Sequence, residues 1–263
     1  MIDTGMQTAV GTRHETNEDA LGELPERFVW LVADGMGGHA AGDVASAMVR
    51  DRILQGVADS EDLSAAIAAA HQDLTTAAAA DPARKGMGST VVAVQLHDSS
   101  AQVAWVGDSR VYLLHDGQLR QLTRDHSLVQ WLVDRGEITA AEAEQHPDRN
   151  VLVRTLGFEQ PVADRTTVEL DAGDVLLLCS DGVTAEVDDA GIGEILRHAD
   201  NAQAAADALI DAVTASHGKD DASAIVLRMP PDDAVASRAW LPAAGGIGLG
   251  LLIYLIWNWM KSS

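Results

Sequence analysis

The chain has 263 residues, of which 47% are hydrophobic, and this supplies enough apolar side chain for a large globular domain. Its 40 acidic residues against 18 basic ones give a formal net charge of −22, which argues against a surface for nucleic acid or anionic lipid. The single cysteine, Cys179, excludes an internal disulfide and is consistent with a reducing compartment.

The first element that the sequence predicts is a strand at residues 4–10, which a polar cluster follows at 11–19. The start of the chain lacks the basic and then apolar segments of a secretion signal, so we expect the domain to be cytoplasmic. Within the cluster, Arg13 is a candidate ligand for an oxyanion, and Glu18 or Asp19 is a candidate for supporting a metal ion or its waters from outside the directly bound ligands. A solvated loop explains the same residues equally well.

An apolar run at residues 28–33 ends in a carboxylate, Asp34, and three glycines stand among the next four residues. This pattern predicts a buried strand that places Asp34 at the edge of a sheet, beside a turn whose backbone carbonyl oxygens lie close to it. Carboxylate and carbonyl oxygens are the ligands that Mg²⁺ and Mn²⁺ prefer. The alternative is that Asp34 caps the helix that follows from about residue 41.

Two alanine-rich segments, 41–57 and 64–80, predict helices, and β-branched residues predict a buried strand at 90–94. Asp116-Gly117 predicts a tight hairpin between two further strands. Short turns between neighbouring strands indicate antiparallel sheets and therefore the α+β fold class.

Three further aspartates repeat the position of Asp34 at one end of an apolar strand. They are Asp108 after the strand at 103–106, Asp181 after that at 175–180, and Asp220 before that at 224–227. If folding brings these side chains together, their mutual repulsion is strongly unfavourable unless cations neutralise it. Two or more divalent ions are the simplest explanation.

The remaining segments before the C-terminal tail are mostly helical. Residues 123–127 predict the cap of a helix at 128–135, and the polar segment 136–150 is typical of a mobile flap beside a site. Two further helices are predicted at 188–198 and 202–216.

The C-terminal tail contains no charged residue from 239 to 260, and as a helix it is long enough to span the hydrocarbon core of a bilayer. We therefore predict a transmembrane tail anchor at 239–260, joined to the domain by a linker at 230–238. A helix docked on the core is the alternative, although the apolar residues lie all around this helix. Gly246 and Gly250 have a spacing found in helix dimers, which is weak evidence in a glycine-rich segment.

The chain resembles the metal-dependent protein phosphatase family (PPM, or protein phosphatase 2C) in its bacterial form, over a domain that we place at residues 1–229. The motifs that carry the resemblance occur in the family's order: NEDA (17–20), DGMGGH (34–39), GST (88–90), GDSR (107–110), TRDHS (123–127), SDG (180–182) and DDAS (220–223). It implies an α-β-β-α sandwich of two antiparallel sheets flanked by helices. It also implies hydrolysis of phosphoserine and phosphothreonine in proteins, with Mn²⁺ or Mg²⁺ as cofactor.

Carried over to this sequence, the resemblance implies that Asp34 bridges two metal ions, that the Gly35 carbonyl completes one, and that Asp181 and Asp220 complete the other. Asp108 would serve a third, weaker ion together with Asp181. Paired ions of this kind activate a bridging hydroxide that attacks phosphorus in line. Asp34, Asp181 and Asp220 are therefore the candidate catalytic residues.

Three positions depart from the family pattern. His14 stands where relatives usually carry the arginine that binds phosphate, so either the adjacent Arg13 takes that role or His14 shares it. Met36 stands where eukaryotic relatives carry a histidine thought to protonate the leaving group, and this proton would come from metal-bound water or from His39. Ala185 replaces a further aspartate that serves the third ion in many relatives.

The leading hypothesis is a phosphoprotein phosphatase tethered to the cytosolic face of the cell membrane, where it opposes a serine/threonine kinase and acts on phosphorylated proteins. One alternative is a relative that binds phosphopeptides without turning them over. Another is a regulator that dephosphorylates one small signalling protein.

Overall fold

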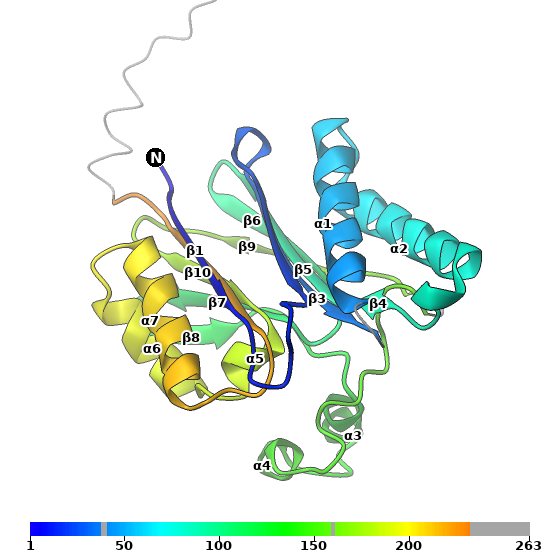
Figure 1. The fold of residues 1–263 in the computed structure, drawn as a ribbon. Helices are drawn as coiled ribbons and strands as arrows, with labels where there is room; N and C mark the ends of the chain where they lie inside the picture. Colours follow the sequence, from blue (N-terminus) through cyan, green and yellow to red (C-terminus); the bar gives the residue numbers. More distant parts are fainter. Residues whose placement is uncertain (38–40, 159–160, 232–263) are drawn as a thin grey trace, which may run out of the picture.

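The structure is a computed structural model, and it describes residues 1–37, 41–158 and 161–231. Two antiparallel sheets lie face to face, and helices cover both outer faces (Figure 1). This confirms the predicted sandwich. The residue His39 and the tail at 239–260 lie outside the described residues, and within the described ranges no helix has the length and apolar character needed to cross a bilayer.

The first sheet joins the two ends of the domain. Its strands lie in the order β1 (Asp3–Ala9), β11 (Ala222–Arg228), β10 (Val175–Cys179), β7 (Arg110–His115) and β8 (Gln118–Gln121). The predicted hairpin at Asp116-Gly117 is confirmed between β7 and β8, where both turn residues have positive φ, as a type I′ turn requires.

The second sheet carries Asp34. Its strands lie in the order β2 (Asp19–Leu24), β3 (Val29–Met36), β5 (Val91–His97), β6 (Ser100–Val106) and β9 (Asp164–Glu169), and the short β4 (Gly88–Ser89) pairs with the end of β3. We did not predict β2 or β9, because DALGEL and DRTTVE contain few large apolar residues. Both strands lie at the edges of the sheet, where a strand has a hydrogen-bonded neighbour on one side only and polar or charged side chains are common.

The helices form the outer layers. Helices α1 (Gly42–Ala58) and α2 (Leu63–Ala80) cover the second sheet, while α6 (Asp189–His198) and α7 (Ala202–Ala215) cover the first. These four confirm the predicted helices. The short α5 (Asp181–Thr184) follows β10 directly, and single 3₁₀ turns occur at Pro25–Arg27 and Pro82–Arg84.

Helices α3 (Leu128–Asp134) and α4 (Ala140–Glu144) project away from the sandwich (Figure 1). Residues 128–151, which contain both helices, are called the flap below. Ser127 caps α3 as predicted, since its side chain accepts the Gln130 N–H. The flap returns to its starting point, because Ser127 bridges to Leu152.

Side-chain alternation along β3 determines where Asp34 points. Val29 and Leu31 pack under α1 and α2, whereas Trp30 and Val32 pack against the other sheet. Because the side-chain period of a strand is two residues, Asp34 continues the row of Trp30 and Val32. Its carboxylate therefore lies at the rim of the space between the sheets.

Candidate active site

Asp19 and Asp34 lie directly opposite each other across β2 and β3. Two carboxylates opposite each other in an antiparallel pair repel each other. The alternative role for Asp34 as a helix cap is wrong, because helix α1 begins at Gly42 without a side-chain cap. A polar loop was one of the two interpretations of residues 11–19, but Asp19 is the first residue of a strand.

Asp181 and Asp220 approach from the other sheet. Asp181 begins α5 just beyond β10, and Asp220 lies two residues before β11, the neighbour of β10. The Ser180 hydroxyl donates to Asp19 Oδ2 at 2.7 Å and so connects the two sheets. A Cβ atom on Gly182 would lie 2.1 Å from the Asp221 carbonyl oxygen, so glycine permits the close approach of α5 to this strand.

Asp108 lies in a turn held by the TRDHS segment. His126 donates its backbone N–H to the Gly107 carbonyl at 2.9 Å, and its Nδ1 accepts the Gly107 N–H at 3.0 Å. On the other side of the turn, the buried hydroxyls of Ser109 and Thr90 are 2.8 Å apart. Thr90 also accepts the Asp34 N–H, so one hydrogen-bonded chain joins the Asp108 turn to β3.

The pKa shifts show that these carboxylates share one place. Burial raises the pKa of Asp34 well above its usual range, and the charges of Asp19, Asp181, Asp108 and Asp220 raise it further. Burial and the charge of Asp220 raise the pKa of Asp181 to about 6, against a hydrogen bond with Asp34 that lowers it. The structure therefore brings together all four aspartates that the sequence singled out, and Asp19 joins them.

Asp19 and Asp108 show the same effect. Burial raises the pKa of Asp19 to about 7, although the hydroxyls of Ser180 and Ser223 lower it by hydrogen bonding. Burial and then the charge of Asp181 raise the pKa of Asp108 well above its usual range. These carboxyls ionise reluctantly until a cation offsets their repulsion.

The cluster fits a hard divalent cation in the chemistry of its donors. Every member is a carboxylate, and Asp19 Oδ1 is buried without a hydrogen-bond partner. Within the described ranges, no group of three or more His, Cys, Asp or Glu side chains is arranged so that it could hold a metal ion as it stands.

Gly35 and Glu18 pack against the start of α1. The Gly35 N–H donates to the Glu18 carbonyl at 3.0 Å, and a Cβ atom on Gly35 would lie 1.9 Å from the Gly42 carbonyl oxygen. The Glu18 carboxylate occupies the space beside Gly42, at the positive end of the α1 dipole. Burial raises the pKa of Glu18.

Asp221 organises the loop that carries Arg13 and His14, a role that the sequence did not reveal. Its buried carboxylate accepts the Gly11 N–H at 2.7 Å, the Glu18 N–H at 2.6 Å and a hydrogen bond from His14 Nδ1 at 2.9 Å. That bond to Asp221 raises the pKa of His14, with smaller contributions from nearby carboxylate charges. The sequence signal that could have revealed this role is the second aspartate of the Asp220-Asp221 pair, which directly precedes β11.

Arg13 and His14 differ in what already holds them. The His14 ring is engaged by Asp221, whereas Arg13 is exposed and no described residue accepts a hydrogen bond from its guanidinium. Ala185 lies at the end of α5, where its N–H donates to the Asp181 carbonyl at 2.8 Å. The methyl side chain of Ala185 has no atom that could coordinate a third metal ion.

Comparison with known proteins identifies the family. Residues 8–224 match the family described as protein phosphatase 2C. The chain is 36% identical over 225 residues to the serine/threonine phosphatase stp of Listeria innocua, covering 81% of this chain and 89% of that protein.

Comparison with solved structures leads to the same family. The Mycobacterium tuberculosis serine/threonine phosphatase PstP/Ppp is 34% identical, with a TM-score of 0.80 over 87% of this chain and 99% of that one. The catalytic domain of PstP in complex with two manganese ions is 33% identical, with a TM-score of 0.78 over 86% of this chain and 97% of that one. With its sandwich, its cluster of carboxylates and these relatives, the chain belongs to the protein phosphatase 2C family and is a bacterial PPM-type phosphoprotein phosphatase.

Proposed function

We propose that the carboxylate cluster holds two Mn²⁺ or Mg²⁺ ions, with which the enzyme hydrolyses phosphoserine and phosphothreonine in proteins. The observation that carries the proposal is the convergence of acidic side chains from both sheets around Asp34. The orphaned oxygen of Asp19 supports it, since a buried acceptor without a donor suits a cation or its water ligands. The relative PstP binds two manganese ions.

The proposed ligands are those that the family resemblance implies. Asp34 lies among the other carboxylates, and together with the Gly35 carbonyl, Asp181 and Asp220 it would hold the two ions. Asp108 is proposed to serve a weaker third ion; in support, its charge raises the pKa of Asp34, and the charge of Asp181 raises its own pKa. When bound, the ions supply positive charge that polarises the phosphoryl group and acidifies water.

The residues of this chain orient the reacting groups. The Ser180 and Ser223 hydroxyls favour the charged form of Asp19, as a partner of the ions requires. Arg13 is proposed to bind the phosphoryl oxygens, because an arginine fork suits them and its guanidinium is free of described partners. Asp221 and His14 hold the loop on which Arg13 stands.

The purified full chain is expected to release phosphate from a phosphothreonine peptide only when Mn²⁺ or Mg²⁺ is present. Excess chelator should stop the reaction and renewed Mn²⁺ should restore it, because the carboxylates alone repel the phosphate. Phosphate release measured with malachite green tests this. A chain that binds the peptide in fluorescence anisotropy without releasing phosphate would instead be a phosphopeptide-binding module.

We further propose that residues 239–260 anchor the enzyme in the cytoplasmic membrane, so that it opposes a serine/threonine kinase there. The support is the charge-free apolar sequence of this segment, flanked by Arg238 and Lys261. Fractionation of cells is expected to recover the full chain with membranes and a chain ending at residue 231 in the soluble fraction. Full-length protein in the soluble fraction would contradict the anchor.

A further inference from the structure

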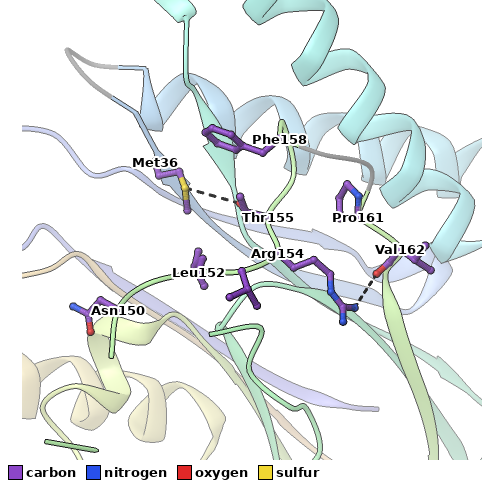
Figure 2. Close-up of a pocket in the computed structure, with 9 residues that line it drawn as sticks. Met36, Asn150, Leu152, Arg154, Thr155, Phe158, Pro161 and Val162 are labelled. Atoms are coloured by element: carbon purple, nitrogen blue, oxygen red, sulfur yellow. Dashed lines mark hydrogen bonds between the residues drawn. The ribbon is translucent and has the colours of Figure 1, made fainter. Parts of the chain in front are cut away.

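A pocket of about 900 Å³ opens beside the carboxylate cluster, between the base of the flap and the end of β3 (Figure 2). Its walls are mainly apolar, with Met36, Leu152, Val153, Phe158 and Val162 among them. No step of the proposed phosphate hydrolysis uses this pocket. We propose that it receives an uncharged apolar side chain of the phosphoprotein substrate, about two residues from the phosphorylated one; this inference rests on the proposed function.

The pocket is continuous with the catalytic rim. Met36 stands two residues beyond Asp34 on the same strand, and two residues of strand span about 7 Å. The Thr155 hydroxyl in the pocket wall donates to the Ser89 carbonyl at 2.9 Å, and the Ser89 hydroxyl donates to the Asp34 carbonyl at 3.0 Å. A peptide whose phosphate lies at the cluster therefore carries a nearby side chain to this pocket.

The wall of the pocket is preformed. A Cβ atom on Gly88 would lie 2.6 Å from the Phe158 ring, so the ring packs directly over the glycine. Gly157 has φ of +92°, and its N–H donates to His71 Nδ1 at 3.1 Å, which fixes the turn before Phe158. A cavity of fixed shape binds an apolar group without first ordering its own wall.

Exposed apolar residues concentrate here. Of the eight large hydrophobic residues that are exposed in the described part of the chain, five lie between residues 131 and 162. Val153 is 53% exposed, Phe158 44% and Val162 77%. Three of these exposed side chains, Val153, Phe158 and Val162, line the pocket, and exposed apolar groups that gather in a pocket beside an active site indicate a bound partner that covers them.

The charges around the pocket disfavour an acidic occupant, and its largely apolar lining favours an uncharged one. Its cationic residue, Arg154, donates to Asp164 at 2.7 Å and reaches toward the Val162 carbonyl (Figure 2), so its charge is already matched. An acidic substrate residue would also meet the acidic field of a chain with a formal charge of −22. A leucine, methionine or phenylalanine side chain of the substrate carries no charge and therefore incurs neither of these electrostatic costs.

The test compares phosphothreonine peptides that carry leucine, glycine or aspartate two residues to either side of the phosphothreonine, using the full chain with Mn²⁺. We expect kcat/KM for the leucine peptide to exceed that for the glycine peptide by about tenfold, mainly through KM. The substitutions Val162→Asp and Phe158→Ala should remove this preference, so that the ratio of kcat/KM for the leucine peptide to that for the glycine peptide falls to about one. Phe28→Asp, at an exposed apolar residue before the opposite end of β3, is the matched control and should keep the preference.

Each other outcome has a separate meaning. Equal rates for the leucine and glycine peptides would overturn the pocket assignment while leaving the proposed function intact. Hydrolysis of none of the peptides would instead defeat the proposed function. A wild-type dimer in sedimentation velocity that dissociates in Val162→Asp would assign the apolar surface to self-association and overturn the proposal.

Discussion

Replacing Asp34 with asparagine is expected to lower kcat for a phosphothreonine peptide by roughly a thousandfold or more, since the proposed site loses the carboxylate at its centre. The same change should stabilise the metal-free fold at pH 8. The reason is that the raised pKa values of Asp34, Asp19 and Asp181 make the native state bind protons more tightly than the unfolded chain. Native stability without metal therefore falls as pH rises from about 4 through about 7, where these groups must ionise.

Thermal unfolding in chelator and in Mn²⁺ measures this effect. Wild type at pH 8 should gain about 5 °C or more in Tm with Mn²⁺, and Asp34→Asn should begin higher and gain little. Asp211→Asn, on the exposed side of α7, is the matched control and should behave as wild type. Arg13→Ala should retain the rise in Tm with Mn²⁺, because the carboxylates are unchanged. It should raise KM for the phosphothreonine peptide, because the proposed phosphate ligand is lost. Asp34→Asn with more than a tenth of wild-type kcat would remove the basis of the proposed site.

Replacing Gly35 with alanine is expected to destabilise the protein by about 3 kcal/mol or more, because the added methyl group meets backbone on two sides. Its Cβ atom would lie 1.9 Å from the Gly42 carbonyl oxygen and 2.8 Å from that of Glu18. Relief requires α1 or β2 to move away from β3, which also displaces Asp34. Urea unfolding of both proteins in chelator gives the difference in stability free of any metal effect.

Gly193→Ala is the control for a glycine without backbone neighbours. It lies in α6, where the nearest atoms to an added Cβ belong to the flexible Arg197 side chain, at 3.3 Å and beyond. We expect no loss of stability, or a gain of about 0.5–1 kcal/mol from the better helix propensity of alanine. If Gly35→Ala unfolded at the same urea concentration as wild type, the close packing of α1 against β3 described above would be wrong.

The sequence was sufficient for elements whose signal is local. The apolar run before Asp34, the alanine-rich helices and the Asp116-Gly117 hairpin each carry their own pattern, and the structure has all of them. The resemblance supplied what local pattern could not, namely that four distant aspartates converge. Convergence depends on how β10 and β11 of one sheet face β2 and β3 of the other, which no single segment encodes.

Asp19 and Asp221 show where local reasoning ends. The position of Asp19 opposite Asp34 depends on the register of β2, a strand too polar to recognise by its own sequence. Asp221 acts through backbone N–H groups of Gly11 and Glu18, about 200 positions earlier in the chain, and backbone donors leave no trace in residue identity. Asp19 was already a candidate for supporting a metal ion or its waters, but its position opposite Asp34, like the whole role of Asp221, became visible only in the tertiary structure.

The closed base of the flap bears on how such enzymes diversify. The Leu128 N–H donates to the Val151 carbonyl at 2.8 Å, so the chain leaves and rejoins the sandwich at one place. A segment whose ends already meet acts as an exchangeable cassette, because changing its length alters loop-closure entropy only logarithmically. Changes in the length or sequence of helices α3 and α4 can therefore accumulate while the sandwich and its carboxylate cluster stay as they are.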